Sequence, residues 1–222
     1  MPADLIHLVR HGEVFNPAGV LYGRLPEFHL SDLGRQMAKL AAQSMAGRQI
    51  VAVTASPLTR TRESAQPWLD DFHLPLQIDD RLIEPTNTFE GVNIRRALRA
   101  NPLLLRRLIN PWKPSWGEPF VSIAARMMEA VAAAHASVER GEVVLVSHQL
   151  PIWMVARTVQ GKPLASDPRH RRCSLSSITT VAWDPAAGGT ASGTPGAGAF
   201  AEVDYQEPAA ALLAESIDLG AV

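Results

Sequence analysis

The chain has 222 residues, of which 46% are apolar and 19% charged, with a formal net charge of −1 at pH 7. This length suits one globular domain with a tail, and the small charge argues against nucleic-acid or membrane binding through bulk charge. Cys173 is the single cysteine, which excludes an intramolecular disulfide and a zinc site built on several thiolates. Because Asp4, His7 and Arg10 interrupt any secretory pattern and no apolar run has the length of a membrane span, we expect a cytoplasmic protein.

The first half of the chain predicts strands that alternate with helices. Short apolar runs rich in β-branched residues predict strands over residues 5–9 and 50–54, and a weaker one over 75–78. Ser31 is a suitable N-cap for a helix that continues to about Met45, and a second helix is predicted over residues 59–69.

The second half continues this alternation up to a flexible loop. Residues 92–109 are predicted to be helical with a break at Pro102, and a Pro- and Trp-rich loop follows. A long helix over residues 121–138, a strand over 143–146, a helix that opens near Pro151 and a strand over 177–183 come next. Residues 185–198 are almost entirely small or flexible and predict a loop, and residues 200–205 predict an edge strand. We therefore expect one domain over residues 1–206, and a tail or short helix over 207–222.

This order of elements predicts an α/β fold, a three-layer sandwich in which helices cover both faces of a mostly parallel sheet. In such sheets the ligand site lies at the carboxyl ends of the strands. Polar clusters stand at three of these ends, at residues 10–11, 56–60 and 147–148. We expect these clusters to form one site.

The residues at these strand ends are typical of a phosphate site. Arg10 and Arg60 supply guanidinium groups that match phosphate oxygens, and His11 and His148 supply imidazoles. A neutral imidazole is a competent nucleophile, so His11 is the candidate for attack on phosphorus. A proton donor for the leaving oxygen is also needed. Glu84 is the first candidate, with Glu90 and Glu13 as alternatives, because a carboxyl beside a dianion has a raised pKa.

At these residues the chain resembles the histidine phosphatase superfamily, with its phosphoglycerate-mutase-like fold. The resemblance covers about residues 4–183 in order and rough spacing. Its blocks are Leu8-Val9-Arg10-His11-Gly12-Glu13, then Asn16, Gly23-Arg24-Leu25, Leu30-Ser31-Asp32-Leu33-Gly34-Arg35-Gln36, Ser56-Pro57-Leu58-Thr59-Arg60-Thr61-Arg62-Glu63-Ser64-Ala65, Leu82-Ile83-Glu84 with Glu90-Gly91, and Val144-Leu145-Val146-Ser147-His148.

The resemblance implies a role for each matched residue. His11 is expected to carry the phosphoryl group as phosphohistidine, and Glu84 to protonate the leaving group and then activate water. The phosphoryl oxygens are expected to bind Arg10, Arg60 and His148. Further phosphate or substrate contacts are predicted from Asn16, Arg24 and Gln149. No metal or cofactor is expected, since the arginines supply the positive charge.

Two features depart from the pattern of the family. Gln149 follows the second histidine where many relatives have glycine, and no aspartate stands there, which argues against the acid-phosphatase branch. The stretch 95–107 carries five arginines but lacks the pattern of the mutase insert. We interpret these arginines as a solvated helix face, with binding of an anionic substrate tail as the alternative.

The sequence therefore predicts a phosphatase that acts on a small phosphorylated metabolite, with neither nucleic acid nor membrane as partner. A phosphoglycerate mutase, a catalytically idle binding relative and, more weakly, a metal-dependent phosphoesterase are the alternatives. A homodimer is compatible with the sequence. The loop with Trp112 and Trp116 is either a substrate lid or a closure of the core, whereas Met127 and Met128 are predicted core residues.

Overall fold

The computed structural model describes residues 2–93, 96–97, 99, 117–166, 171–184 and 200–218. These residues form a six-stranded sheet in the order β3-β2-β4-β1-β5-β6. The strands are β1 (Leu5–Arg10), β2 (Ile50–Ala55), β3 (Leu76–Ile78), β4 (Glu142–Ser147), β5 (Ile178–Trp183) and β6 (Phe200–Gln206).

The sheet is mostly parallel, as predicted. β3, β2, β4 and β1 run parallel to one another, and β5 pairs antiparallel with both β1 and β6. The central strands β1 and β4 are buried along nearly their whole length, whereas β6 is an edge strand with exposed positions. Continuous apolar runs at residues 5–9 and 143–146 thus reflect strands that are covered on both faces.

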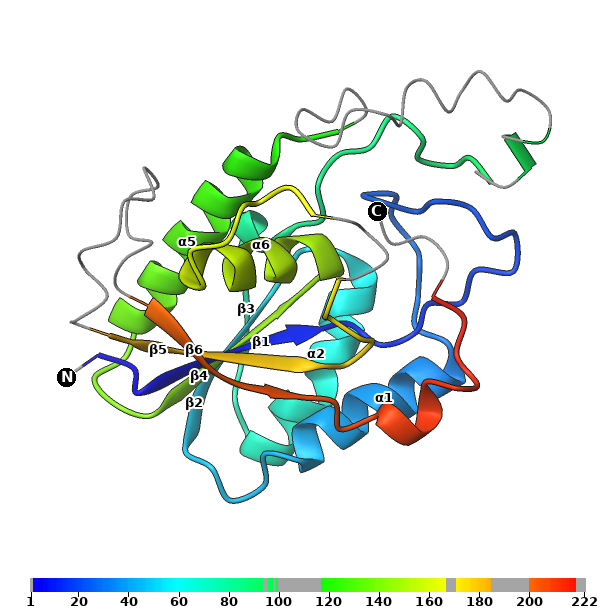
Figure 1. Cartoon of the computed structure of the whole chain (residues 1–222). Helices are drawn as coiled ribbons and strands as arrows, with labels where there is room; N and C mark the ends of the chain where they lie inside the picture. The colour runs from blue at the N-terminus through cyan, green and yellow to red at the C-terminus, as the bar shows by residue number, and fades with distance from the viewer. Residues whose placement is uncertain are drawn as a thin grey trace.

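Two pairs of helices cover the two faces of the sheet (Figure 1). The pair α1 (Asp32–Gln43) and α2 (Thr59–Phe72) lies on one face, and α5 (Phe120–Ala136) and α6 (Gln149–Val159) lie on the other. Successive residues of β4 serve the two cores in turn, because side chains alternate along a strand: Val144 packs with the first pair, and Val143 and Leu145 with the second. This is the predicted three-layer sandwich.

The local signals in the sequence are largely confirmed. Ser31 caps α1, with its Oγ accepting a hydrogen bond from the Gly34 amide at 2.9 Å. Met127 and Met128 are core residues, 0% and 2% exposed. The break at Pro102, the loop with Trp112 and Trp116, and the loop 185–198 lie outside the described residues. In the described segments, no helix combines the length and apolar content needed to cross a membrane.

A polar network surrounds buried His7 near the start of β4, where a parallel sheet seldom carries a ligand site. The His7 ring donates from Nε2 to Glu142 Oε2 at 2.8 Å, and its Nδ1 lies 3.0 Å from Thr180 Oγ1. Arg48 donates two hydrogen bonds to the same carboxylate, at 2.6 and 2.9 Å. Burial lowers the pKa of His7, and the bonds from Arg48 and His7 outweigh the burial of Glu142 and lower its pKa.

Candidate active site

The register of the sheet brings the three polar clusters to one edge. Arg10 at the end of β1 lies beside Ser147 at the end of β4, and Ala55 at the end of β2 lies beside Val146. The next residues continue this pairing, since the His11 amide donates to Ser147 O at 3.1 Å and the Ser56 amide to Val146 O at 3.0 Å. His11, Ser56 and His148 therefore follow three adjacent strand ends.

His11 is held as a neutral imidazole with a defined tautomer. Its Nδ1 lies 2.7 Å from Gly12 O, and because a carbonyl can only accept, Nδ1 carries the proton. Burial, followed by the charges of Arg60 and Arg10, lowers the pKa of His11 well below its ordinary value. The ring centroid lies 5.2 Å from that of His148. Nε2 thus carries the free lone pair that a nucleophile needs.

The loop after β1 is fixed by close backbone contacts that only glycine allows. A Cβ on Gly12 would lie 2.3 Å from Gly34 O, and a Cβ on Gly34 would lie 2.0 Å from Glu13 O. The Gly12 amide also donates to Ser64 Oγ at 3.1 Å. Both flanking helices, α1 and α2, therefore help to hold the main chain that carries His11.

Two buried guanidinium groups flank this imidazole. Arg10 is 0% and Arg60 1% exposed, which is rare for arginine, and Arg10 is paired with the Asp218 carboxylate at 2.6 Å. Arg60 donates to Gly23 O at 2.7 Å and lies 4.7 Å above the Tyr22 ring, and the pKa of that tyrosine is raised by burial to about 12. Among the described residues, Nε of Arg10 and Nε of Arg60 have no hydrogen-bond partner. Buried donors of this kind suit an anion with several oxygens.

Glu84 and His148 form a buried pair beside these groups. His148 is 0% exposed; its Nε2 lies 2.9 Å from Ser56 Oγ and its Nδ1 3.4 Å from Glu84 Oε2. Burial raises the pKa of Glu84 to about 7, although Arg60 and Arg10 oppose the shift. Burial likewise lowers the pKa of His148 well below its ordinary value. Both groups are thus favoured in their uncharged forms, and Glu84 can give up or take a proton near neutral pH.

The loop that carries Glu84 is anchored from two sides. Ser147 Oγ donates to Leu82 O at 2.7 Å, which ties the loop to the end of β4. Arg24 Nε donates to Glu84 O at 2.5 Å, and Arg24 Nη2 lies 3.3 Å from Glu118 Oε2. The structure therefore places Arg24, a predicted substrate contact, on the main chain of the acid loop.

The remaining predicted contacts differ in how closely they join this cluster. Asn16 bridges the main chain of Val20, with Nδ2 donating to Val20 O at 2.8 Å and Oδ1 accepting from Val20 N at 3.2 Å. Gln149 Nε2 donates to Cys173 O at 3.5 Å, and Arg10 donates to the same carbonyl at 2.7 Å. Asn16 is therefore used in a turn, whereas Gln149 lies next to Arg10.

The two alternative acids are committed to other partners. Glu13 accepts hydrogen bonds from Ser31 Oγ and, at 2.6 Å, from the amide of Ile217. Glu90 Oε1 accepts from the Arg24 amide at 2.9 Å. The geometry thus favours Glu84 among the three carboxyl groups.

Sequence reasoning did not assign roles to three residues near the site. Ser56 bonds His148, Tyr22 stacks on Arg60, and Asp218 Oδ1 accepts a hydrogen bond from Arg10 Nη2 at 2.6 Å. Ser56 directly follows β2 and belongs to the strand-end cluster 56–60 that the sequence predicts, but the sequence does not show that it bonds His148. No pattern around Asp218 connects it with Arg10, 208 positions earlier.

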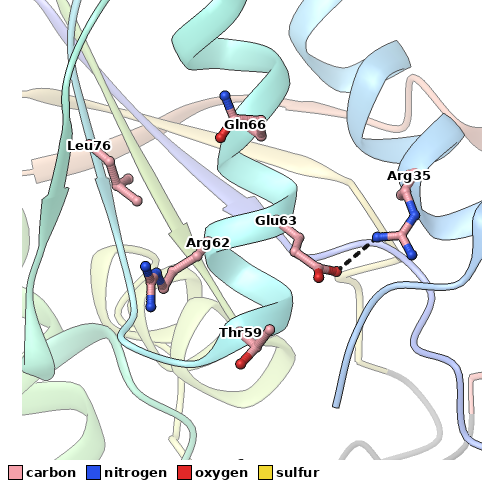
Figure 2. Close-up of a pocket in the computed structure, with 6 residues that line it drawn as sticks. All are labelled: Arg35, Thr59, Arg62, Glu63, Gln66 and Leu76. Carbon is pink, nitrogen blue, oxygen red and sulfur yellow. Dashed lines mark hydrogen bonds and ion pairs between the residues drawn. The ribbon is translucent and has the colours of Figure 1, made fainter. Parts of the chain in front are cut away.

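A separate pocket of about 460 Å³ lies along α2 (Figure 2). It is lined by Arg35, Thr59, Arg62, Glu63, Gln66 and Leu76, and Glu63 is paired with Arg35 at 3.2 Å. None of the strand-end histidines or buried arginines lines it. Within the described part of the chain, no three side chains of the metal-binding types gather as a metal site would require.

Comparison with known proteins gives a family that agrees with this geometry. The family model described as histidine phosphatase superfamily (branch 1) matches residues 6–190. The chain belongs to the histidine phosphatase superfamily. Its predicted membership is confirmed, and the family with its phosphatase relatives places the chain among phosphatase-type hydrolases.

Three relatives illustrate the match. An uncharacterized protein of Mycobacterium tuberculosis is 48% identical over 187 residues, which cover 83% of this chain and 93% of that protein. A glucosyl-3-phosphoglycerate phosphatase of Mycolicibacterium vanbaalenii is 30% identical over 211 residues, 90% of each chain. The solved structure of a mycobacterial glucosyl-3-phosphoglycerate phosphatase aligns with a TM-score of 0.65 at 26% identity, and covers 81% of this chain and 90% of its own.

Proposed function

We propose that the chain hydrolyses a small phosphomonoester through a phosphohistidine formed at His11, without a metal ion. The observation that carries the proposal is the pair of buried guanidinium groups beside a neutral imidazole whose Nδ1 is committed to Gly12 O. Arg10 and Arg60 bind the phosphoryl oxygens and stabilise the charge of the transition state. His11 Nε2 is the one ring nitrogen left to attack.

The first half-reaction transfers the phosphoryl group to the enzyme. His11 Nε2 forms a bond to phosphorus while the ester P–O bond breaks, and the leaving oxygen takes the proton of the Glu84 carboxyl and departs as an alcohol. A pKa of about 7 keeps a large fraction of Glu84 protonated at neutral pH. If Ser56 donates to His148 Nε2, His148 carries its proton on Nδ1 and can donate it to a phosphoryl oxygen.

The second half-reaction restores the enzyme. The Glu84 carboxylate takes a proton from water, the water oxygen bonds to phosphorus, and the P–N bond to His11 breaks. The products are inorganic phosphate, neutral His11 and protonated Glu84, so protons and charges balance over the cycle. The positive charge that a metal ion would supply comes from the two arginines.

The substrate belongs to the class of small phosphorylated metabolites. Similarity to glucosyl-3-phosphoglycerate phosphatases supports this class and makes a phosphorylated glyceric acid the first compound to test. The cytoplasmic location, the absence of nucleic-acid partners and the compatibility with a homodimer stay predictions.

The test is hydrolysis of an aryl phosphate with a chelator present, by wild type, His11→Ala and Glu84→Gln. We expect chelator-resistant activity that His11→Ala nearly abolishes, and radioactive label from the phosphoryl group on wild type after a rapid quench. Turnover that survives His11→Ala, or that the chelator removes, would contradict the mechanism. Interconversion of 2- and 3-phosphoglycerate with a trace of bisphosphoglycerate, exceeding hydrolysis, would favour the mutase alternative.

A further inference from the structure

β6 runs in the same direction as β1, and the segment after it continues from the edge where these strands end and passes beside α1 (Figure 1). Ala209 is 1% exposed and packs in a cluster with Met37 of α1 and Leu175. Glu207 Oε1 accepts hydrogen bonds of 2.7 Å from both Ser174 Oγ and Tyr205 OH. A 3₁₀ turn, η6 (Ala210–Leu212), follows. The start of the segment is therefore attached to the domain by the packing of Ala209 and by the hydrogen bonds of Glu207.

The end of the segment reaches the proposed phosphate site. The Ile217 amide donates to Glu13 Oε1 at 2.6 Å, on the loop that also carries His11. The Asp218 carboxylate accepts the 2.6 Å hydrogen bond from Arg10 Nη2. Arg10 is fully buried, whereas the Asp218 side chain is 37% exposed. A solvent-accessible carboxylate thus reaches in to the guanidinium group that precedes the nucleophile.

The electrostatics of Arg10 respond to this contact. Burial acts to lower the pKa of Arg10, but the charge of Asp218 and the hydrogen bond that Arg10 donates to it act to raise the pKa, and the net shift is upward. A carboxylate and a phosphoryl group both offer anionic oxygens to a guanidinium group. A dianionic phosphate on Arg10 would also be repelled by a carboxylate held at the same group.

We propose that Asp218 occupies the place of a phosphoryl oxygen on Arg10, so that the carboxylate of this segment competes with phosphate for the site. The inference rests on the proposed function. A phosphomonoester then binds only after Asp218 has left Arg10, and the carboxylate can return as inorganic phosphate departs. Asp218 is thus a residue of the site that sets phosphate affinity without entering the chemistry.

The size of the effect follows from the fraction of molecules in which Asp218 holds Arg10. A partly exposed ion pair is weak, so a closed fraction of roughly 70–90% is reasonable. Because the apparent affinity falls in proportion to the open fraction, loss of the carboxylate should tighten phosphate binding roughly three- to tenfold.

The experiment measures binding of inorganic phosphate to the full chain by calorimetry at constant ionic strength and pH 7.5. Asp218→Asn and Asp218→Ala remove the charge at an exposed position, and Glu215→Gln is the matched control. Glu215 lies on the same segment and is exposed, whereas the Arg10 guanidinium group donates to Cys173 O and Asp218 Oδ1. We expect the two Asp218 variants to lower the Kd for phosphate and the KM for an aryl phosphate about three- to tenfold, with Glu215→Gln unchanged.

Two results would overturn the proposal. One is an unchanged or weaker phosphate affinity in both Asp218 variants. The other is a fall in kcat/KM, because that would make Asp218 a residue that positions Arg10 rather than one that competes for it. Arg10→Ala separates this inference from the proposed function: loss of phosphate binding in that variant supports the site whatever Asp218 does, and unchanged binding contradicts the site itself.

Discussion

Replacement of Glu84 by glutamine is the sharpest test of the proposed chemistry. In the wild type, Glu84 Oε2 lies 3.4 Å from His148 Nδ1. Glutamine keeps the size and position of this side chain but removes the proton that the carboxyl group transfers. With a pKa of about 7, Glu84 is the site group whose titration falls between pH 6.5 and 9. The pKa values of His11 and His148 lie well below their ordinary value, and those of Tyr22 and Cys173 are raised to about 12 and about 11.

The sign of the pH dependence follows from the form that acts. Glu84 must be protonated to donate, so kcat/KM for an alkyl phosphate is constant below the pKa and falls tenfold per pH unit above it. At pH 9, roughly 1% of Glu84 is protonated, which lowers kcat/KM about a hundredfold. Loss of a general acid costs about 10²–10⁴-fold for a poor leaving group. A nitrophenolate leaves without a proton, so kcat/KM for a nitrophenyl phosphate should fall far less.

The assay compares kcat/KM for an alkyl and a nitrophenyl phosphate between pH 6.5 and 9, where both substrates are mainly dianions. The pH dependence of kcat/KM reports the pKa values of the free enzyme, and kcat/KM includes the steps up to the first irreversible one. Glu90→Gln is the matched control, because an amide oxygen can keep the hydrogen bond from the Arg24 amide. Two results would refute the role of Glu84. One is a fall in kcat/KM above pH 7 that persists in Glu84→Gln, and the other is an equal decrease of kcat/KM for the two substrates in that variant.

Two further predictions compare a buried or paired residue with an exposed residue of the same type nearby in the chain. Arg60→Ala should lower kcat/KM for an aryl phosphate by about 10²–10³-fold. Arg62→Ala, at an exposed position on the same helix, should leave kcat/KM within about twofold of wild type. An equal decrease of kcat/KM in the two variants would contradict the phosphate site. Glu142→Gln should lower the free energy of unfolding by about 1–3 kcal/mol at pH 7 through the lost bonds to buried His7, with the exposed Glu139→Gln as control. Because folding lowers the pKa of Glu142, its stabilisation is present above the ordinary value of 4.5 and is lost as the pH falls below it, so urea melts of wild type and variant should converge in acid.

Most of the fold was predictable from local signals. Strands at residues 5–9 and 143–146 were predictable as continuous apolar runs because both faces of a central strand are buried. The start of α1 was predictable because the hydroxyl of Ser31 can cap a helix. The direction of β5 was not predictable. The alternation of apolar and polar residues at 177–183 predicts a strand but not whether it runs parallel or antiparallel to its neighbour. The antiparallel pairing of β5 with β1 depends on the path of the chain before β5.

The candidate site also has a part that the sequence predicted and a part that it did not. His11, Arg10, Arg60 and His148 follow strand ends or open the next helix, so their convergence comes with the topology. For Arg24 the structure adds a contact that the sequence did not predict: its Nε donates to the main chain of Glu84, while substrate contact by Arg24 stays a prediction. The partner of a long cationic side chain depends on which loops meet in space, and local spacing does not record that.

The hydrogen bond from His11 Nδ1 to Gly12 O also determines which phosphohistidine isomer the proposed mechanism produces. With Nδ1 committed to a main-chain carbonyl, the phosphoryl group is carried on Nε2, and this assignment does not depend on any neighbouring side chain. A P–N bond on imidazole survives alkali and is cleaved by acid. The intermediate should therefore be sought by quenching in base, and the phosphorus resonance of the digested peptide should identify the Nε2 isomer.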